Sequence, residues 1–221
     1  MKIFIRFLLF LLFIILLPAQ TSDKKHQTKK HSFNDAKRWA KMFENPERDE
    51  WQQPNFVIQS MGIQPNAVIV DIGSATGYFP VRFAKVVPNG KVIGIDVEKD
   101  MVDYLNNRSQ NEGIKNLYSI LGEFHDPKIP EPADFIFICD TYHHIEDRVE
   151  YFKNIKSDFK PNGKLVIVDF KKGDLPVGPP DKHKISPEDV IKELEKAGYV
   201  LTQHQNDLIY QYMLTFVLRD I

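Results

Sequence analysis

The sequence predicts an α/β fold: a doubly wound, mostly parallel seven-stranded sheet that ends in an antiparallel C-terminal hairpin. From residue 67 onwards, short apolar runs alternate with amphipathic segments of helical period, as expected when parallel strands are buried on both faces. A glycine-containing loop follows the first run, where a strand turns into a helix. Near the C-terminus, the two runs 199–204 and 209–218 follow each other with no helix between them, which indicates the hairpin.

Each unit of this alternation can be placed along the chain. The last helix has the clearest limits, because Ser186 is a helix-capping residue and Gly198 is a typical helix stop. The earlier strands are expected at residues 67–70, 91–95, 116–121, 133–139 and 164–169. The helices are expected at residues 34–43, 55–61, 78–87, 100–110, 146–159 and 186–197.

The loop at residues 71–77, Asp-Ile-Gly-Ser-Ala-Thr-Gly, is the most informative segment. Gly73 and Gly77 allow the backbone to approach a ligand closely, and Asp71 ends the preceding strand, where open α/β sheets bind ligands. The glycine spacing differs from the Gly-x-Gly-x-x-Gly of dinucleotide folds, and a carboxylate at this place would repel phosphate. It suits a cationic or hydrogen-bond-donating ligand, such as an amino acid moiety.

This loop resembles motif I of the class I S-adenosylmethionine (SAM)-dependent methyltransferases, Asp/Glu-x-Gly-x-Gly-x-Gly, with Ala75 at the middle glycine. The resemblance implies a Rossmann-like methyltransferase fold with SAM as cofactor. It also implies that Asp71, Gly73 and Gly77, together with Ser74, surround the amino acid end of SAM.

Three further acidic residues stand near strand ends. Asp96 ends the second strand about 20 residues beyond the glycine loop, where a carboxylate can accept both ribose hydroxyl hydrogens. Val97 follows it and is expected at the cofactor. By the resemblance, Glu123 in the loop after the third strand receives the adenine amino group, and Asp140 at the end of the fourth strand lies beside the methyl group.

Titratable and aromatic side chains crowd the segment after Asp140. In the resembled family this position lies next to the transferable methyl group, so Tyr142 and His143 are candidate catalytic residues. His143 is the preferred general base, and His183, in the proline-rich loop, is the second candidate. A purely structural role stays open for both His143 and His144. Neighbouring histidines seldom converge on one ion and no third ligand is evident, so no metal is expected.

The predicted function is SAM-dependent transfer of a methyl group to a small molecule, with lipids and quinones among the candidate acceptors. The Tyr-His-His segment at residues 142–144 resembles that of the quinone and small-molecule methyltransferase group. Arsenic methyltransferases resemble it too but use several thiols, so arsenic as substrate is disfavoured because Cys139 is the only cysteine. A net charge of −1 without a basic-aromatic patch gives no support to nucleic acid. Alternatives are a non-catalytic cofactor-binding protein and a nicotinamide-dependent oxidoreductase, the latter disfavoured by the glycine spacing and the hairpin.

The N-terminus predicts export or membrane association. Residues 1–19 combine a basic start with an apolar run of about 11 residues, as in a signal peptide or a membrane anchor. Residues 20–33 read as a flexible basic linker containing Lys24, Lys25, Lys29 and Lys30. We expect cleavage, with an uncleaved anchor on a cytoplasm-facing enzyme as the alternative, and a methyltransferase domain over residues 34–221. The oligomeric state stays open.

Overall fold

The computed structural model describes residues 35–219. The predicted signal or anchor at residues 1–19 and the linker at residues 20–33 therefore lie outside the described residues. Within the described range, no helix combines the length and apolarity needed to cross a membrane.

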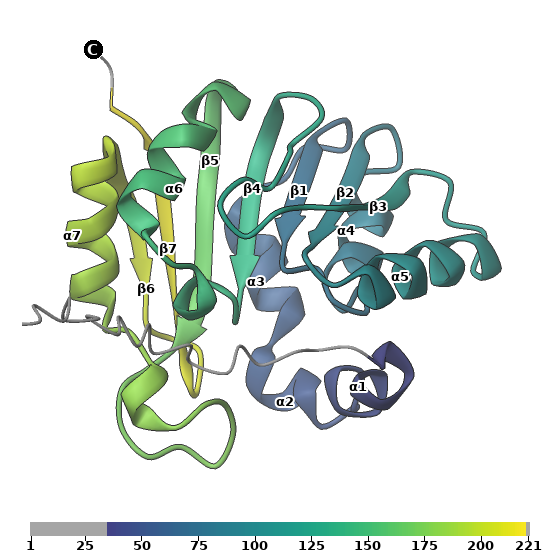
Figure 1. Ribbon diagram of the computed structural model, residues 1–221, viewed down its shortest axis with the longest axis horizontal. Helices are drawn as coiled ribbons and strands as arrows, with labels where there is room; N and C mark the ends of the chain where they lie inside the picture. Colours follow the sequence, from purple (N-terminus) through teal and green to yellow (C-terminus); the bar gives the residue numbers. More distant parts are fainter. Residues whose placement is uncertain (1–34, 220–221) are drawn as a thin grey trace, which may run out of the picture. The chain divides into compact units, whose positions relative to one another are not determined.

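One sheet of seven strands organises the described residues. Its strands are β1 (Val68–Ile72), β2 (Lys91–Asp96), β3 (Leu117–Leu121), β4 (Ala133–Cys139), β5 (Phe159–Phe170), β6 (Tyr199–Gln205) and β7 (Gln211–Leu218). Their order across the sheet is β3-β2-β1-β4-β5-β7-β6 (Figure 1). The pairs among β1 to β5 are parallel, and β7 runs antiparallel to both β5 and β6. The predicted fold class is thus confirmed.

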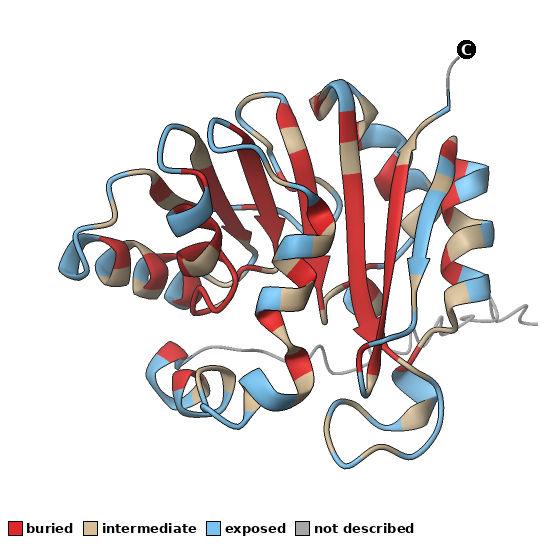
Figure 2. Cartoon of the chain, turned by 180° about the vertical axis from the view of Figure 1, so that it is seen from behind, coloured by how far each residue is buried: buried red, intermediate tan, exposed pale blue. Residues whose placement is uncertain are grey.

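Helices cover both faces of this sheet. They are α1 (Ala36–Phe43), α2 (Arg48–Gln52), α3 (Pro54–Met61), α4 (Pro80–Val86), α5 (Lys99–Asn111), α6 (Arg148–Asn154) and α7 (Pro187–Ala197). Phe152 of α6 and Leu194 of α7 belong to the apolar core on one face. Val57, Phe83 and Leu105, from α3, α4 and α5, belong to the core on the other. The central strands are buried between these two layers (Figure 2).

Two segments differ from the pattern of alternating strands and long helices. The expected helix at residues 146–159 is shorter, since α6 ends at Asn154 and a 3₁₀ turn, Ile155–Asp158, follows it. The turn expected at residues 160–163 is absorbed into β5 as a bulge, where Asn162 has φ 63°. The bulge lets β5 continue along β4, so one long strand replaces a turn and a short strand.

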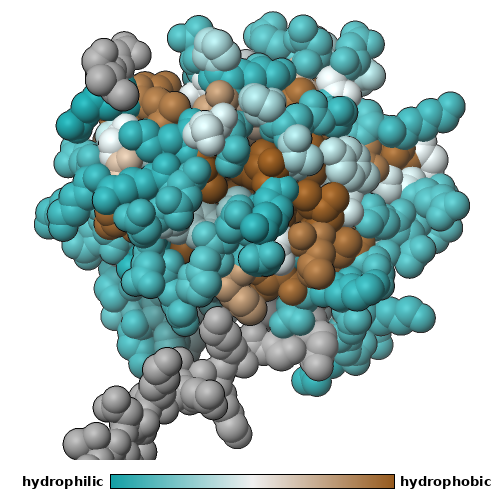
Figure 3. Space-filling view, turned by 45° about the horizontal axis from the view of Figure 1, so that its top comes forward, coloured by the Kyte–Doolittle hydropathy of each residue, from teal (hydrophilic) through white to brown (hydrophobic). Residues whose placement is uncertain are grey.

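The connection from β3 to β4, residues 122–132, forms no helix and contains only an isolated bridge between Glu123 and Asp126. The sequence predicted a loop here. Part-buried apolar side chains, among them Tyr118, Ile120 and Ile129, pack against the core on this face. Apolar surface is visible near the middle of the view in Figure 3, within a hydrophilic periphery.

The carboxyl ends of β1, β2, β4 and β5 meet at one edge of the sheet, the lower edge in Figure 1. α1, α2 and the loop after β5 also lie at this edge. That loop contains a 3₁₀ turn, Asp181–His183. Because parallel strands present their terminal residues together at their carboxyl ends, Asp71, Asp96 and Asp140 gather here.

Candidate functional site

The glycine loop connects β1 to α4 and packs closely against residues of other segments. Gly73 and Gly77 have φ of 81° and 95°, a region that glycine adopts without strain. A side chain at Gly73 would collide with Thr141, and one at Gly77 would collide with Leu105. The Gly73 amide donates to the carbonyl of Ile95 on β2 at 2.8 Å, which holds the loop against the next strand.

Asp96 fixes the middle of that loop. Its carboxylate accepts from the Ala75 amide at 2.9 Å and from the Glu98 amide at 3.0 Å. Ala75, which replaces the middle glycine of the motif, has φ 45° and so occupies the left-handed region. Burial raises the pKa of Asp96, although these amide donors lower it. The next residue, Val97, leaves 37% of its surface exposed beside this carboxylate.

Asp71 is buried at the end of β1 with 3% of its surface exposed. No residue in the described range donates a hydrogen bond to its carboxylate. Burial, with the nearby charge of Asp96, raises the pKa of Asp71 to about 8 against the opposing effect of Arg48. The adjacent Ser74 hydroxyl is also buried without a hydrogen-bond partner. Together they fit a ligand that brings a cationic donor group, as the amino acid end of SAM does.

A polar network that the sequence did not reveal links α2, β4 and β7 at the carboxyl edge of the sheet. The Arg48 guanidinium lies 3.9 Å from the Tyr78 ring centroid and donates to Asp140 Oδ2 at 3.4 Å. The other Asp140 oxygen accepts from Gln211 of β7, and Gln211 accepts from the fully buried Gln52. Arg48 also donates to Gln52, four residues on, so α2 is tied to β4 and β7. That i,i+4 spacing was the available signal in a segment interpreted as a charged connection.

Burial raises the pKa of Asp140 to about 6, and the charge of Arg48 opposes this shift. Asp140 has φ 55°, a strained conformation for a residue other than glycine. It therefore combines backbone strain with a partly compensated carboxylate at the end of β4.

His143 pairs with a carboxylate that the sequence did not single out. Its Nδ1 lies 3.0 Å from both carboxylate oxygens of Asp169, which stands near the end of β5. The His143 side chain is 3% exposed and that of Asp169 is fully buried. Burial disfavours the imidazolium, but the hydrogen bond and charge of Asp169 outweigh it and raise the pKa of His143. The Asp169 contact fixes one ring nitrogen and leaves Nε2 as the atom able to exchange a proton.

A family described as methyltransferase domain matches residues 63–216, which span the sheet and the glycine loop. The chain belongs to the methyltransferase domain family. The family and its structural relatives assign SAM as the cofactor.

Among curated relatives, the ubiquinone/menaquinone biosynthesis C-methyltransferase UbiE of Pectobacterium carotovorum is 26% identical over 122 residues, which are 53% of this chain and 48% of that protein. The UbiE protein of Proteus mirabilis is 24% identical with the same coverage. The chain thus spans about half the length of the curated relatives it matches.

Solved structures share the fold over more of the chain. A SAM dependent methyltransferase from Aquifex aeolicus has a TM-score of 0.77 and 29% identity, covering 83% of this chain and 98% of its own. A putative type 11 methyltransferase from Sulfolobus solfataricus, with a TM-score of 0.57, 21% identity and coverage of 70% and 85%, shows the fold alone.

Tyr142 does not fit the catalytic role expected for this methyltransferase-family chain. The side chain is fully buried and stacks on Phe152, with ring centroids 5.4 Å apart. Its hydroxyl donates to Glu193 at 2.7 Å, and Arg148 pairs with the same carboxylate. The expectation is corrected because Tyr142 anchors η1, the 3₁₀ turn Tyr142–His144, in the core and its hydroxyl is already engaged.

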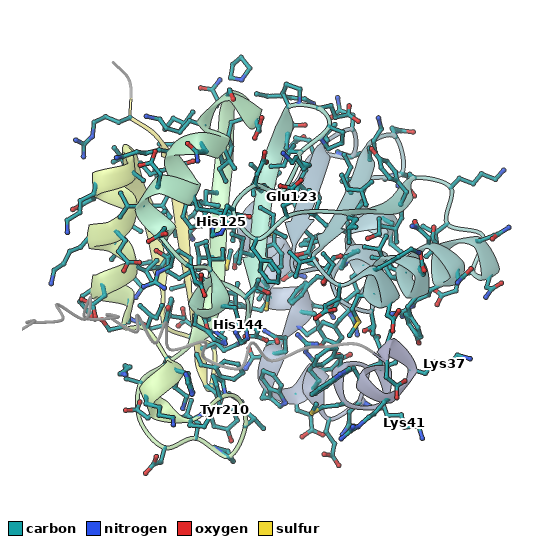
Figure 4. The ribbon with its side chains drawn as sticks, in the orientation of Figure 1. Lys37, Lys41, Glu123, His125, His144 and Tyr210 are labelled. Carbon is teal, nitrogen blue, oxygen red and sulfur yellow. The ribbon has the colours of Figure 1, made fainter. Side chains whose placement is uncertain are left out.

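His183 and Glu123 are both exposed. His183 ends the 3₁₀ turn in the loop after β5. Glu123 lies on the loop that crosses the front of the sheet (Figure 4), with 70% of its side chain exposed and Lys128 3.7 Å away. The amide of Gly122 donates to the Asp96 carbonyl, which keeps the start of the loop beside β2. The general-base role of His183 and the contact of Glu123 with adenine stay predictions.

No group of three or more histidine, cysteine, aspartate or glutamate side chains in the described range is arranged to hold a metal ion.

Proposed function

We propose that the protein is a SAM-dependent methyltransferase that acts on a small apolar acceptor. The buried Asp71 carboxylate, without a hydrogen-bond donor inside a glycine loop, carries this proposal. Its environment disfavours an isolated charge, so a ligand ammonium would compensate it. A dinucleotide phosphate would bring no positive charge to compensate the carboxylate.

Residues of different chemistry would bind different parts of the cofactor. Asp71, Ser74 and the backbone at Gly73 and Gly77 would hold the amino acid end. Asp96 would accept from the ribose hydroxyls with the lone pairs that the Ala75 and Glu98 amides do not use. Val97 and Glu123 would flank the adenine. SAM supplies a methyl group on a sulfonium, so the protein contributes chiefly alignment.

In this proposal His143 is the general base that removes a proton from the methyl acceptor. Asp169 holds its Nδ1, and a neutral Nε2 would accept the hydroxyl proton of an acceptor such as a quinol. A ring carbon of the quinol would then take the methyl group as the bond between that group and the SAM sulfur breaks, and the same carbon would lose its proton to water, which restores the aromatic ring. The similarity to a quinone C-methyltransferase supports this acceptor class.

Transfer of label from methyl-labelled SAM to lipid, quinol and thiol extracts tests the proposal. We expect label in the quinol or lipid fraction. His143→Ala should abolish it, whereas the exposed neighbour changed by His144→Ala serves as the matched control. SAM binding without transfer to any fraction would instead support the non-catalytic cofactor-binding protein.

We also propose that residues 1–19 direct the chain to the membrane or across it, with cleavage after the apolar run. The basic start and short apolar run support a signal peptide. Mass spectrometry of the N-terminus of the cellular protein tests this. An intact Met1 on membrane-bound protein would instead identify an uncleaved anchor.

A further inference from the structure

We propose that the outward face of α1 is a docking surface for an anionic lipid membrane. Successive residues of a helix are rotated by about 100°. Lys37 and Lys41 therefore share one stripe, and Arg38 and Met42 share the next. All four are exposed, and Met42 leaves 55% of its surface in solvent. This basic stripe with an apolar margin has the composition of a helix that lies on a membrane surface.

The positive charge of this stripe is not neutralised by the fold. Lys37 and Lys41 form no salt bridge with any described residue, and Figure 4 shows both extending away from the body of the protein. Some lysines elsewhere do form salt bridges, as Lys99 does with Asp103 on α5. The acids that flank α1 are engaged as well: Asp35 caps the helix, and Glu44 pairs with Arg108.

The chain that leads into α1 argues for lipid as the occupant. Residues 20–34, which the proposed cleavage retains, contribute four more lysines. A cluster of basic residues next to a surface helix is attracted by anionic leaflets. A polyanion would also bind the charges, but it would gain nothing from the exposed Met42.

Docking through α1 would turn the cofactor site toward the membrane. α1 lies at the carboxyl edge of the sheet, where the acidic site residues gather (Figure 1). The β6–β7 turn reaches the same edge, because Phe170 at the end of β5 pairs with Gln211. Ile209 in this turn is 52% exposed, and Figure 4 shows Tyr210 toward this lower edge. An apolar acceptor dissolved in the bilayer would then approach the site from the docked side.

Vesicle binding of the full-length chain tests the proposal. The probes are vesicles of phosphatidylcholine alone and vesicles with about 30% phosphatidylglycerol, compared at low and high salt. We expect preference for the anionic vesicles, weakened by salt. The triple variant Lys37→Gln, Arg38→Gln, Lys41→Gln should lose about tenfold or more of this binding.

The matched control removes three positive charges elsewhere, by Lys85→Gln, Lys115→Gln and Lys196→Gln, and should lose no more than about twofold. Equal losses in the two triple variants would overturn the proposal, because net charge and not α1 would then explain the binding. Absence of any preference for anionic vesicles would overturn it too.

A spin label at Met42→Cys reports the docked orientation. The native Cys139 is buried and burial raises the pKa of its thiol, so the label should attach at residue 42. On anionic vesicles we expect this label to be shielded from aqueous relaxants, whereas a label at Val86→Cys on α4 should stay accessible. A label at residue 42 that stays aqueous while the protein is bound would contradict docking through α1. SAM titration of the α1 variant, expected to match the wild type, separates this failure from failure of the proposed function.

Discussion

Asp71 lies where β1 enters the glycine loop, and its environment favours the neutral carboxyl. In the unfolded chain the same group ionises near its ordinary value of 3.8, whereas burial raises the pKa in the fold to about 8. Between these values the folded state holds a proton that the unfolded state has lost. The stability of the cofactor-free protein should therefore fall as pH rises through this window.

Urea unfolding from mildly acidic to mildly alkaline pH measures this contribution. Asp71→Asn removes the titrating group and keeps the shape, so the decline in the free energy of unfolding should flatten in the variant. The exposed change Asp174→Asn is the control and should retain the wild-type slope. A wild-type protein whose stability rises through this window with Asp71 intact would contradict the assignment.

His143 offers a second test at a single residue, because its raised pKa depends on Asp169. The pair stabilises the fold while His143 is protonated. This stabilisation is fully present below the unfolded pKa of 6.5 and is lost as pH rises through the higher folded value. By NMR, we expect Asp169→Asn to lower the pKa of His143, with His144 as the internal reference. An unchanged His143 titration would show that the pair has no electrostatic role.

The substitution Ala75→Gly tests how much conformational strain the alanine in place of the motif glycine adds to the fold. Its φ of 45° lies in the left-handed region, which costs a residue with a side chain about 1 kcal/mol. After the greater entropy of glycine in the unfolded chain is subtracted, Ala75→Gly should raise the free energy of unfolding by about 0.5 kcal/mol. The same substitution at Ala84 in α4 should lower it by about 1 kcal/mol or more. Destabilisation by Ala75→Gly in a chemical denaturation series would count against strain in the loop.

At the scale of elements, α2 connects the end of the glycine loop to the sheet through Arg48. Arg48 stacks on one side of Tyr78 and bonds to Asp140, while Arg82 of α4 lies 4.0 Å from the same ring and pairs with Asp49. The contact of Arg48 with Asp140 is part-buried, whereas that of Arg82 with Asp49 is more exposed. The part-buried contact should therefore contribute more to the order of the loop.

Arg48→Ala should therefore loosen α1 and α2 and weaken SAM binding about tenfold, since Asp140 and Gln52 lose their shared donor. Hydrogen exchange over residues 36–61 and a SAM titration measure the two effects. Arg82→Ala is the matched control and should change both by less than about threefold. Equal effects of the two variants would show that the network of Arg48, Asp140 and Gln52 does not order the site.

The elements themselves were largely predictable because local signals agreed with the fold. Ser186 caps α7 and Gly198 ends it with φ 94°, as the residue types indicated. The shortened α6 was not predictable, because its end depends on tertiary packing beyond the local pattern. Nor was the bulge in β5, since Lys-Pro-Asn-Gly is an ordinary turn sequence that becomes a bulge only when β4 extends beside it.

At the scale of the whole molecule, the parallel topology explains why the site was partly visible in sequence. Asp71, Asp96 and Asp140 end neighbouring strands, so the alternating pattern alone placed them at one edge. Their partners came from distant parts of the chain. Arg48 and Gln211 join Asp140 over separations of 92 and 71 residues, and no local spacing signals such contacts.

SAM binding by isothermal titration calorimetry tests the central claim most directly. In buffers of different ionisation enthalpy at neutral pH, we expect one SAM per chain with release of a proton from Asp71, as the ligand ammonium favours the carboxylate. Asp71→Asn should abolish the proton release, and Asp96→Asn should weaken binding about tenfold or more. The account would be contradicted by failure of the wild type to bind SAM, or by binding that neither variant changes.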